Sequence, residues 1–144
     1  MRLYVALLLC LLCMLPACGS GLPGSSTLTV TISPPNANVA SGMTATFTGN
    51  GTGFSQVPLP QWQMVESTSV ANEHCGFLIG STQNANFTNC PMGYVVYDIN
   101  QFPSTATYYA PPTTGVYHVQ FSATQFSTFD HVTKTTTAPV TVTP

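Results

Sequence analysis

The stretch Thr114-Gly-Val-Tyr-His-Val-Gln-Phe-Ser-Ala-Thr124 shows a β-strand pattern more clearly than any other part of this chain. Its apolar side chains, at positions 117, 119, 121 and 123, alternate with polar ones at 118, 120, 122 and 124. Successive side chains of a strand point to opposite faces, so this alternation predicts a strand with one buried and one solvent-facing side. Gly115 marks a turn immediately before the strand.

The same alternation recurs along most of the chain. It is found at 28–33, 44–48, 61–65 and 140–143, and turn-forming stretches such as Pro34-Pro35 and Gly49-Asn50-Gly51 follow the first two segments. No window has a sustained helical period. Short alternating strands separated by turns predict an antiparallel β-sandwich.

Two details of these strands resemble immunoglobulin-like domains. Tyr117 follows a turn glycine at the start of its strand, which resembles the tyrosine corner, and Trp62 resembles the core tryptophan of the third strand. Val119 lies where antibody domains carry a cysteine, and we expect Phe47 to fill the space of the missing intersheet disulfide. The resemblance implies an all-β, immunoglobulin-like antiparallel β-sandwich of about seven strands, with Tyr117 largely buried and Trp62 between the sheets.

Longer segments are similar to bacterial Ig-like (BIG-type) domains. The similarity is carried by Thr29–Thr48, by Trp62, by Tyr108-Tyr-Ala-Pro-Pro112 and by the ending from 115 to 143. It covers the first and last thirds of a domain spanning 27–144, and fails over 66–102, which we interpret as an insert. Such modules serve as spacers, stalks and accessory domains, so the resemblance implies an interaction role rather than a defined activity.

Residues 1–18 end in Leu15-Pro-Ala-Cys18 and resemble a bacterial lipoprotein signal. Arg2 precedes an apolar run from Leu3 to Leu15, which is too short to span a bilayer but fits a signal-peptide core. The resemblance implies that residues 1–17 are removed and that Cys18 is lipidated. Soluble secretion, with cleavage after Ala17 or Gly19, is the alternative.

Residues 18–26 then form a lipidated cysteine followed by a short tether rich in glycine and serine. The resemblance implies an extracytoplasmic protein held in the cell envelope by its lipid. The residue after Cys18 is Gly19 and not aspartate, which favours the outer membrane if the source has two membranes.

Charge excludes several classes of partner. Charged residues make up only 4 % of the chain, and after removal of the signal Lys134 stands against Glu66, Glu73, Asp98 and Asp130. A surface without a basic patch is unsuited to nucleic acid and to electrostatic docking on anionic lipid. We therefore expect membrane attachment through the lipid anchor only.

Two cysteines are left within the domain. Cys10 and Cys13 leave with the signal, and Cys18 is modified, so Cys75 and Cys90 are predicted to form a disulfide in an oxidising compartment. The alternative is a metal site with His74 or Glu73, although the paired spacing typical of zinc ligands is missing. We further expect the disulfide, instead of regular sheet pairing, to hold the insert together.

No sequence pattern indicates catalysis or a cofactor. Asp130 and His131 are adjacent, and adjacent side chains on an extended chain point to opposite sides. No serine lies in a nucleophile-elbow motif, which leaves a small hydrolase as a distant alternative. The sequence therefore favours a protein that is not an enzyme.

Aromatic residues are concentrated in the insert, and Tyr94 and Tyr97 are its candidate ligand contacts. They either pack the insert onto the sandwich or form an exposed platform for a glycan or an envelope protein. The predicted function is a lipid-anchored envelope module with an interaction, adhesion or scaffolding role. The alternative is a carbohydrate-binding accessory module that uses these aromatics.

Overall fold

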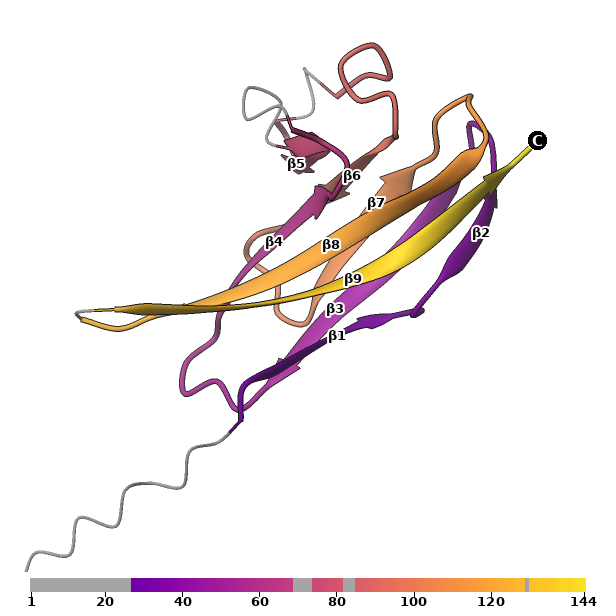
Figure 1. Cartoon of the computed structure of the whole chain (residues 1–144). Coiled ribbons are helices and arrows are strands. Elements are labelled where there is room, and N and C mark those ends of the chain that lie inside the picture. Colours follow the sequence, from indigo (N-terminus) through magenta and orange to yellow (C-terminus); the bar gives the residue numbers. More distant parts are fainter. Residues whose placement is uncertain (1–26, 69–73, 82–84, 129) are drawn as a thin grey trace, which may run out of the picture.

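Nine strands form two facing sheets in the computed structural model, which describes residues 27–68, 74–81, 85–128 and 130–144 (Figure 1). Sheet A has the order β1 (Thr29–Ser33), β3 (Thr44–Thr52), β7 (Ser104–Tyr109), β6 (Tyr94–Tyr97) and β5 (Gly76–Leu78). Sheet B has the order β2 (Ala37–Ala40), β9 (His131–Thr143), β8 (Gly115–Phe126) and β4 (Leu59–Met64). This arrangement confirms the predicted immunoglobulin-like β-sandwich. Within the described part of the chain, no helix could cross a bilayer.

The core lies between the sheets and is built from the alternating strands. Trp62 on β4 and Phe121 on β8 are cross-strand partners whose ring centroids lie 4.7 Å apart, and both are fully buried. Phe47 on β3 is buried opposite them. A Cβ atom at Gly49 would lie 2.5 Å from the ring of Phe121, so glycine makes room for that ring. The prediction that Trp62 lies between the sheets is confirmed.

Tyr117 differs from its prediction in burial. Its hydroxyl donates to the Thr113 carbonyl oxygen at 3.4 Å and lies 3.0 Å from the Thr113 hydroxyl, as a tyrosine corner requires. The side chain is only half-buried, because β8 begins at Gly115 and Tyr117 therefore lies near the end of the sandwich.

The strand count exceeds the predicted seven for two reasons. The first strand is divided at Pro34-Pro35, so β1 pairs antiparallel with β3 while β2 pairs parallel with β9 in the other sheet. The insert also adds strands to sheet A, where β6 pairs antiparallel with β7, and β5 pairs parallel with β6. The expectation that the insert lacks regular sheet pairing is therefore wrong. Val95 and Tyr97 face the core, and their burial explains why β6 joins the sheet.

The two ends of the sandwich carry different loops (Figure 1). At the leader end, which we define by Thr27, the chain packs against Gly53 just after β3. The β3–β4 loop, the β6–β7 loop and the β8–β9 hairpin lie at this end. The opposite end, which we call the insert end, carries the β2–β3 turn, β5 with the neighbouring insert segments, and the C-terminus.

Candidate functional site

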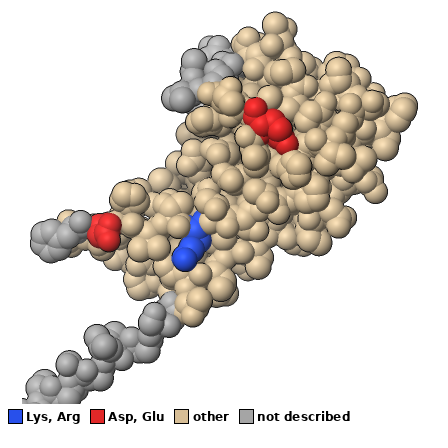
Figure 2. Space-filling view, in the orientation of Figure 1, with Lys and Arg blue, Asp and Glu red and all other residues tan. Residues whose placement is uncertain are grey.

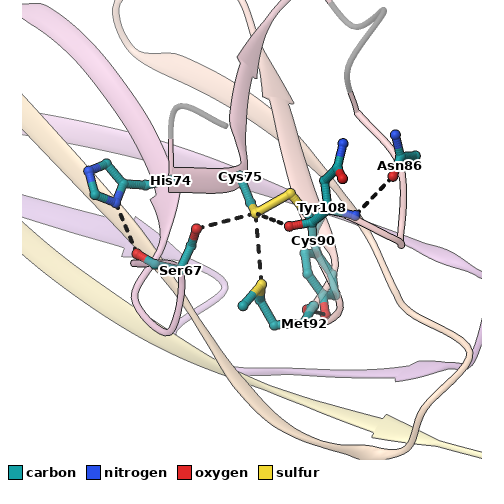
Figure 3. The surroundings of a disulfide bond; sticks show 8 residues. Ser67, His74, Cys75, Asn86, Cys90, Met92 and Tyr108 are labelled. Carbon is teal, nitrogen blue, oxygen red and sulfur yellow. Dashed lines mark hydrogen bonds between the residues drawn. A yellow bond between two sulfur atoms is a disulfide. The ribbon is translucent and has the colours of Figure 1, made fainter. Parts of the chain in front are cut away.

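The disulfide is built into the core of the insert (Figure 3). Cys75 and Cys90 are bonded and fully buried, which confirms the predicted pairing and leaves no thiolate for a metal. The Ser67 hydroxyl lies 3.4 Å from the Cys75 sulfur and is the donor, since a disulfide sulfur carries no proton. Met92 contacts the same sulfur at 3.8 Å.

The alternative prediction was a metal site that uses His74 or Glu73. His74 Nδ1 lies 2.9 Å from the Ser67 carbonyl oxygen, and Glu73 lies outside the described residues. Among the residues that the structure describes, no three potential ligands gather to hold a metal ion.

A histidine and a carboxylate do pair on the surface, but they are not the two residues considered in the sequence analysis. His118 Nδ1 lies 2.6 Å from Glu66 Oε1, and the His118 amide donates to Glu66 Oε2 at 3.1 Å. The His118 and Glu66 side chains are 44 % and 32 % exposed, so the pair ties the start of the insert to β8 at the surface. Asp130 Oδ1 accepts a hydrogen bond from the backbone amide of His131 at 2.7 Å, and the other hydrogen bonds of Asp130 join its backbone to Ser127.

Tyr94 lies in an aromatic cluster on the outer face of sheet A. Its ring stacks on Tyr109 with centroids 4.8 Å apart, and the centroids of Phe87 and Phe77 lie 5.5 and 6.0 Å away. Burial, and secondarily Tyr109, raises the pKa of the Tyr94 hydroxyl. We call Phe77, Phe87, Tyr94 and Tyr109 the aromatic cluster.

Tyr97 lies on the other side of the same strand. It is 6 % exposed and belongs to the core, which leaves little of its surface for a ligand. Of the two predicted ligand contacts, Tyr94 and Tyr97, only Tyr94 remains a candidate, together with the other residues of the aromatic cluster. Tyr109 was missed at the sequence level because only the register of β6 on β7 places it opposite Tyr94.

Exposed apolar side chains also lie at the insert end. Met43 precedes Thr44, the cross-strand partner of Tyr109, and its carbonyl oxygen accepts a hydrogen bond from the Ala110 amide at 2.9 Å. The exposed apolar side chains at this end include Met43, Ile79 and Val116, in addition to Phe87 of the cluster itself. Exposed apolar side chains that lie together on a rigid scaffold are typical of protein-binding surfaces.

The leader end holds a shallow, open surface pocket of about 450 Å³. Gly51, Gly53, Phe102 and the loop residues 54–58 line it, and none of them is charged. Two hydrogen bonds fix the loop on β8: the Ser55 amide donates to Gln125 Oε1 at 2.8 Å, and Gln125 Nε2 donates to the Ser55 hydroxyl at 2.7 Å. The face seen in Figure 2 is almost free of charge.

Comparison with known proteins adds a likeness of fold to solved structures. No protein-family model matches the sequence, and no curated protein matches it. Among solved structures, the chain is similar to the fibronectin(III)-like modules of Clostridium thermocellum CbhA, with 17 % identity and a TM-score of 0.43. The alignment covers 80 % of this chain and 46 % of that one, so this chain spans about half of that chain's length.

Proposed function

We propose that this protein is a lipid-anchored, immunoglobulin-like module of a bacterial cell envelope with a non-enzymatic interaction or scaffolding role. The observation that carries the proposal is that the aromatic cluster and several exposed apolar side chains lie at the same end of the sandwich, the insert end. That end lies opposite Thr27, the residue that leads towards Cys18 (Figure 1).

The anchor is the first part of the proposal. Cys18 lies outside the described residues, and its role is supported by the likeness of Leu15-Pro-Ala-Cys18 to a lipoprotein signal. Nine residue steps separate Cys18 from Thr27, a reach of about 30 Å at most. Such a tether would hold the leader end near the membrane and direct the insert end towards other envelope components.

The partner is the second part, and a protein suits the insert end better than a glycan. A sugar platform needs an open aromatic face, whereas the rings of Tyr94 and Tyr109 cover each other. Met43 and Ile79 add aliphatic area, being 62 % and 69 % exposed. Exposed apolar patches mark sites of protein interaction.

The anchor is tested by metabolic labelling with an alkyne fatty acid. Wild-type protein should take up the label and enter the detergent phase, since several acyl chains together hold a protein stably. Cys18→Ser should take up no label and remain a precursor, while Cys13→Ser serves as the matched control. Mature, unlabelled wild-type protein in the aqueous phase would disprove the anchor.

The partner surface is tested by site-specific photo-crosslinking in living cells. A benzophenone amino acid at Phe87, in the aromatic cluster, should give a discrete crosslinked protein. The same probe at Thr31, exposed on the edge strand β1 away from the cluster, is the control and should give none. Equal crosslinking from both positions, or only glycan attached at Phe87, would contradict a protein partner at this end.

A further inference from the structure

We propose that the leader end makes a second, direct contact with the bilayer through Val57, Leu59 and Phe126. The inference rests on the proposed lipid anchor at Cys18. The sequence analysis predicted that only the lipid anchor attaches the protein to the membrane. The proposed contact adds apolar side chains of the domain to that attachment.

The three side chains are exposed although they are apolar. Val57 is 81 % exposed, Leu59 42 % and Phe126 56 %. Leu59 pairs with Thr124, and Phe126 lies two residues further along β8, so both project from the outer face of sheet B. Val57 precedes Leu59 by two residues in the loop that Ser55 and Gln125 hold on β8. We call these three residues the leader-end patch.

The bilayer is the proposed binding partner of this patch, because the segment between the anchor and the domain is short. The chain reaches Thr27 beside Gly53, at the start of the loop that carries Val57. Nine residue steps separate Cys18 from Thr27, so the lipid lies at most about 30 Å from Thr27. The patch is therefore held at high effective concentration next to the lipid surface, and contact costs little further translational freedom.

Charge on the β8–β9 hairpin neither opposes nor drives this contact. Its charged residues are Asp130 and Lys134, one of each sign. These two charges therefore give the hairpin no net electrostatic attraction to anionic lipid. An apolar route needs no basic patch, because amphipathic surfaces bind the interface through buried apolar area.

The experiment uses the acylated full chain in phosphatidylcholine vesicles, with and without bromine on the lipid acyl chains. Phe126→Trp places a fluorescent reporter in the leader-end patch. Val116→Trp, at a similarly exposed apolar site of the insert end, is the matched control. Trp62 is buried and contributes the same background to both variants. Brominated lipid should quench the tryptophan at 126 by roughly half and leave that at 116 unchanged, as expected for insertion to the acyl boundary.

The readouts separate this inference from the anchor itself. Protein that fails to float with vesicles would show that the anchor is wrong. Protein that floats, but whose tryptophan at 126 is quenched no more than that at 116, would overturn the lipid contact while the anchor stands. Shielding of residue 126 from aqueous iodide without quenching by bromine would indicate a second copy on the patch and would also overturn it. Val57→Ser with Leu59→Ser should reduce the quenching at 126.

Discussion

At the scale of single residues, Trp62 connects the two sheets by both packing and hydrogen bonding. Its indole is fully buried, and Nε1 donates to the hydroxyl of Ser104 on sheet A at 2.9 Å. Trp62→Ala should lower the free energy of unfolding by about 3–5 kcal/mol through the cavity it leaves. Ser104→Ala should cost about 1–3 kcal/mol, because it leaves the indole N–H buried without an acceptor.

Urea unfolding followed by far-UV circular dichroism measures both changes. Thr46→Ala, on the exposed outer face of sheet A, is the control and should change the free energy of unfolding by less than about 0.5 kcal/mol. If Ser104→Ala proved as costly as Trp62→Ala, the hydrogen bond rather than the packing would dominate at this position.

Tyr108 gives the protein a dependence on alkaline pH. Burial raises the pKa of its hydroxyl, Tyr117 and Glu66 raise it further, and the hydroxyl donates to the Met92 carbonyl oxygen at 2.8 Å. A raised pKa means that the folded state keeps a proton that the unfolded chain loses above about pH 10. Stability from this source is therefore complete below about pH 10 and falls as the pH rises further.

Chemical unfolding at about pH 8 and about pH 11, with absorbance titration of the phenols, measures this loss. Tyr108→Phe should be less stable at the lower pH, because the hydrogen bond to Met92 is gone, but should lose less on going to the higher pH. Tyr94→Phe, whose hydroxyl also has a pKa raised by burial, should reduce the pH dependence as well. If the variant that carries both Tyr108→Phe and Tyr94→Phe kept the pH dependence of the wild-type stability, this explanation would be wrong.

At the scale of elements, the disulfide and β5 form one unit at the edge of sheet A. Among the described strands, β5 pairs only with β6, and Gly76 lies so close to the Trp62 backbone that a Cβ would collide with its carbonyl oxygen. Replacing both cysteines with Ala should cost about 3 kcal/mol in the chain-entropy model of a loop of this length. The loss should be local, because the bond joins segments on either side of β5 and does not cross between the sheets.

Hydrogen exchange distinguishes a local from a global loss. The Ile79 amide, which donates to the Tyr97 carbonyl oxygen at 2.9 Å, should exchange faster in the double variant, whereas amides between β3 and β7 should stay protected. Ser67→Ala removes a contact to the Cys75 sulfur and keeps the bond, so it should leave the exchange of Ile79 nearly unchanged. Equal acceleration in all strands would show that the disulfide supports the whole sandwich.

The elements also show which parts of the fold are visible in the sequence. The strand of Tyr117 was predictable because one buried face enforces a strict alternation over many residues. The short strand Gly76–Leu78 was not, because three residues carry no readable period and its pairing with β6 depends on contacts formed elsewhere. Pro34-Pro35 was recognised as the end of a strand, but the crossing of the chain into the other sheet requires the position of β9.

The candidate sites divide in the same way, into those visible in the sequence and those that depend on strand pairing. The pairing of Cys75 with Cys90 was predictable because these are the only two cysteines between residues 27 and 144. Tyr94 was found from composition, but its stacking on Tyr109 depends on strand register. The leader-end patch was not visible, because Val57 and Phe126 come from separate segments that adjoin only when β4 pairs with β8.

At the scale of the whole molecule, the near absence of charge makes the fold depend on packing and on uncharged hydrogen bonds. The charged residues of the described part are Glu66, Asp98, Asp130 and Lys134, and Glu66 pairs with the half-exposed His118. Surface pairs of this kind contribute about 0–1 kcal/mol and are screened by salt. The buried apolar side chains between the sheets therefore supply most of the stability.

Salt should consequently act on this domain through the solvent rather than through its charges. Between about 0.05 and 0.5 M sodium chloride the free energy of unfolding should change by less than about 0.5 kcal/mol, since few charges are available to screen. Sodium sulfate should raise it, because excluded salts strengthen apolar burial. Urea unfolding in each salt measures both effects, and Glu66→Gln is the control that removes the paired carboxylate. A strong response to sodium chloride that Glu66→Gln abolishes would show that this one surface pair, and not packing, sets the stability of the domain.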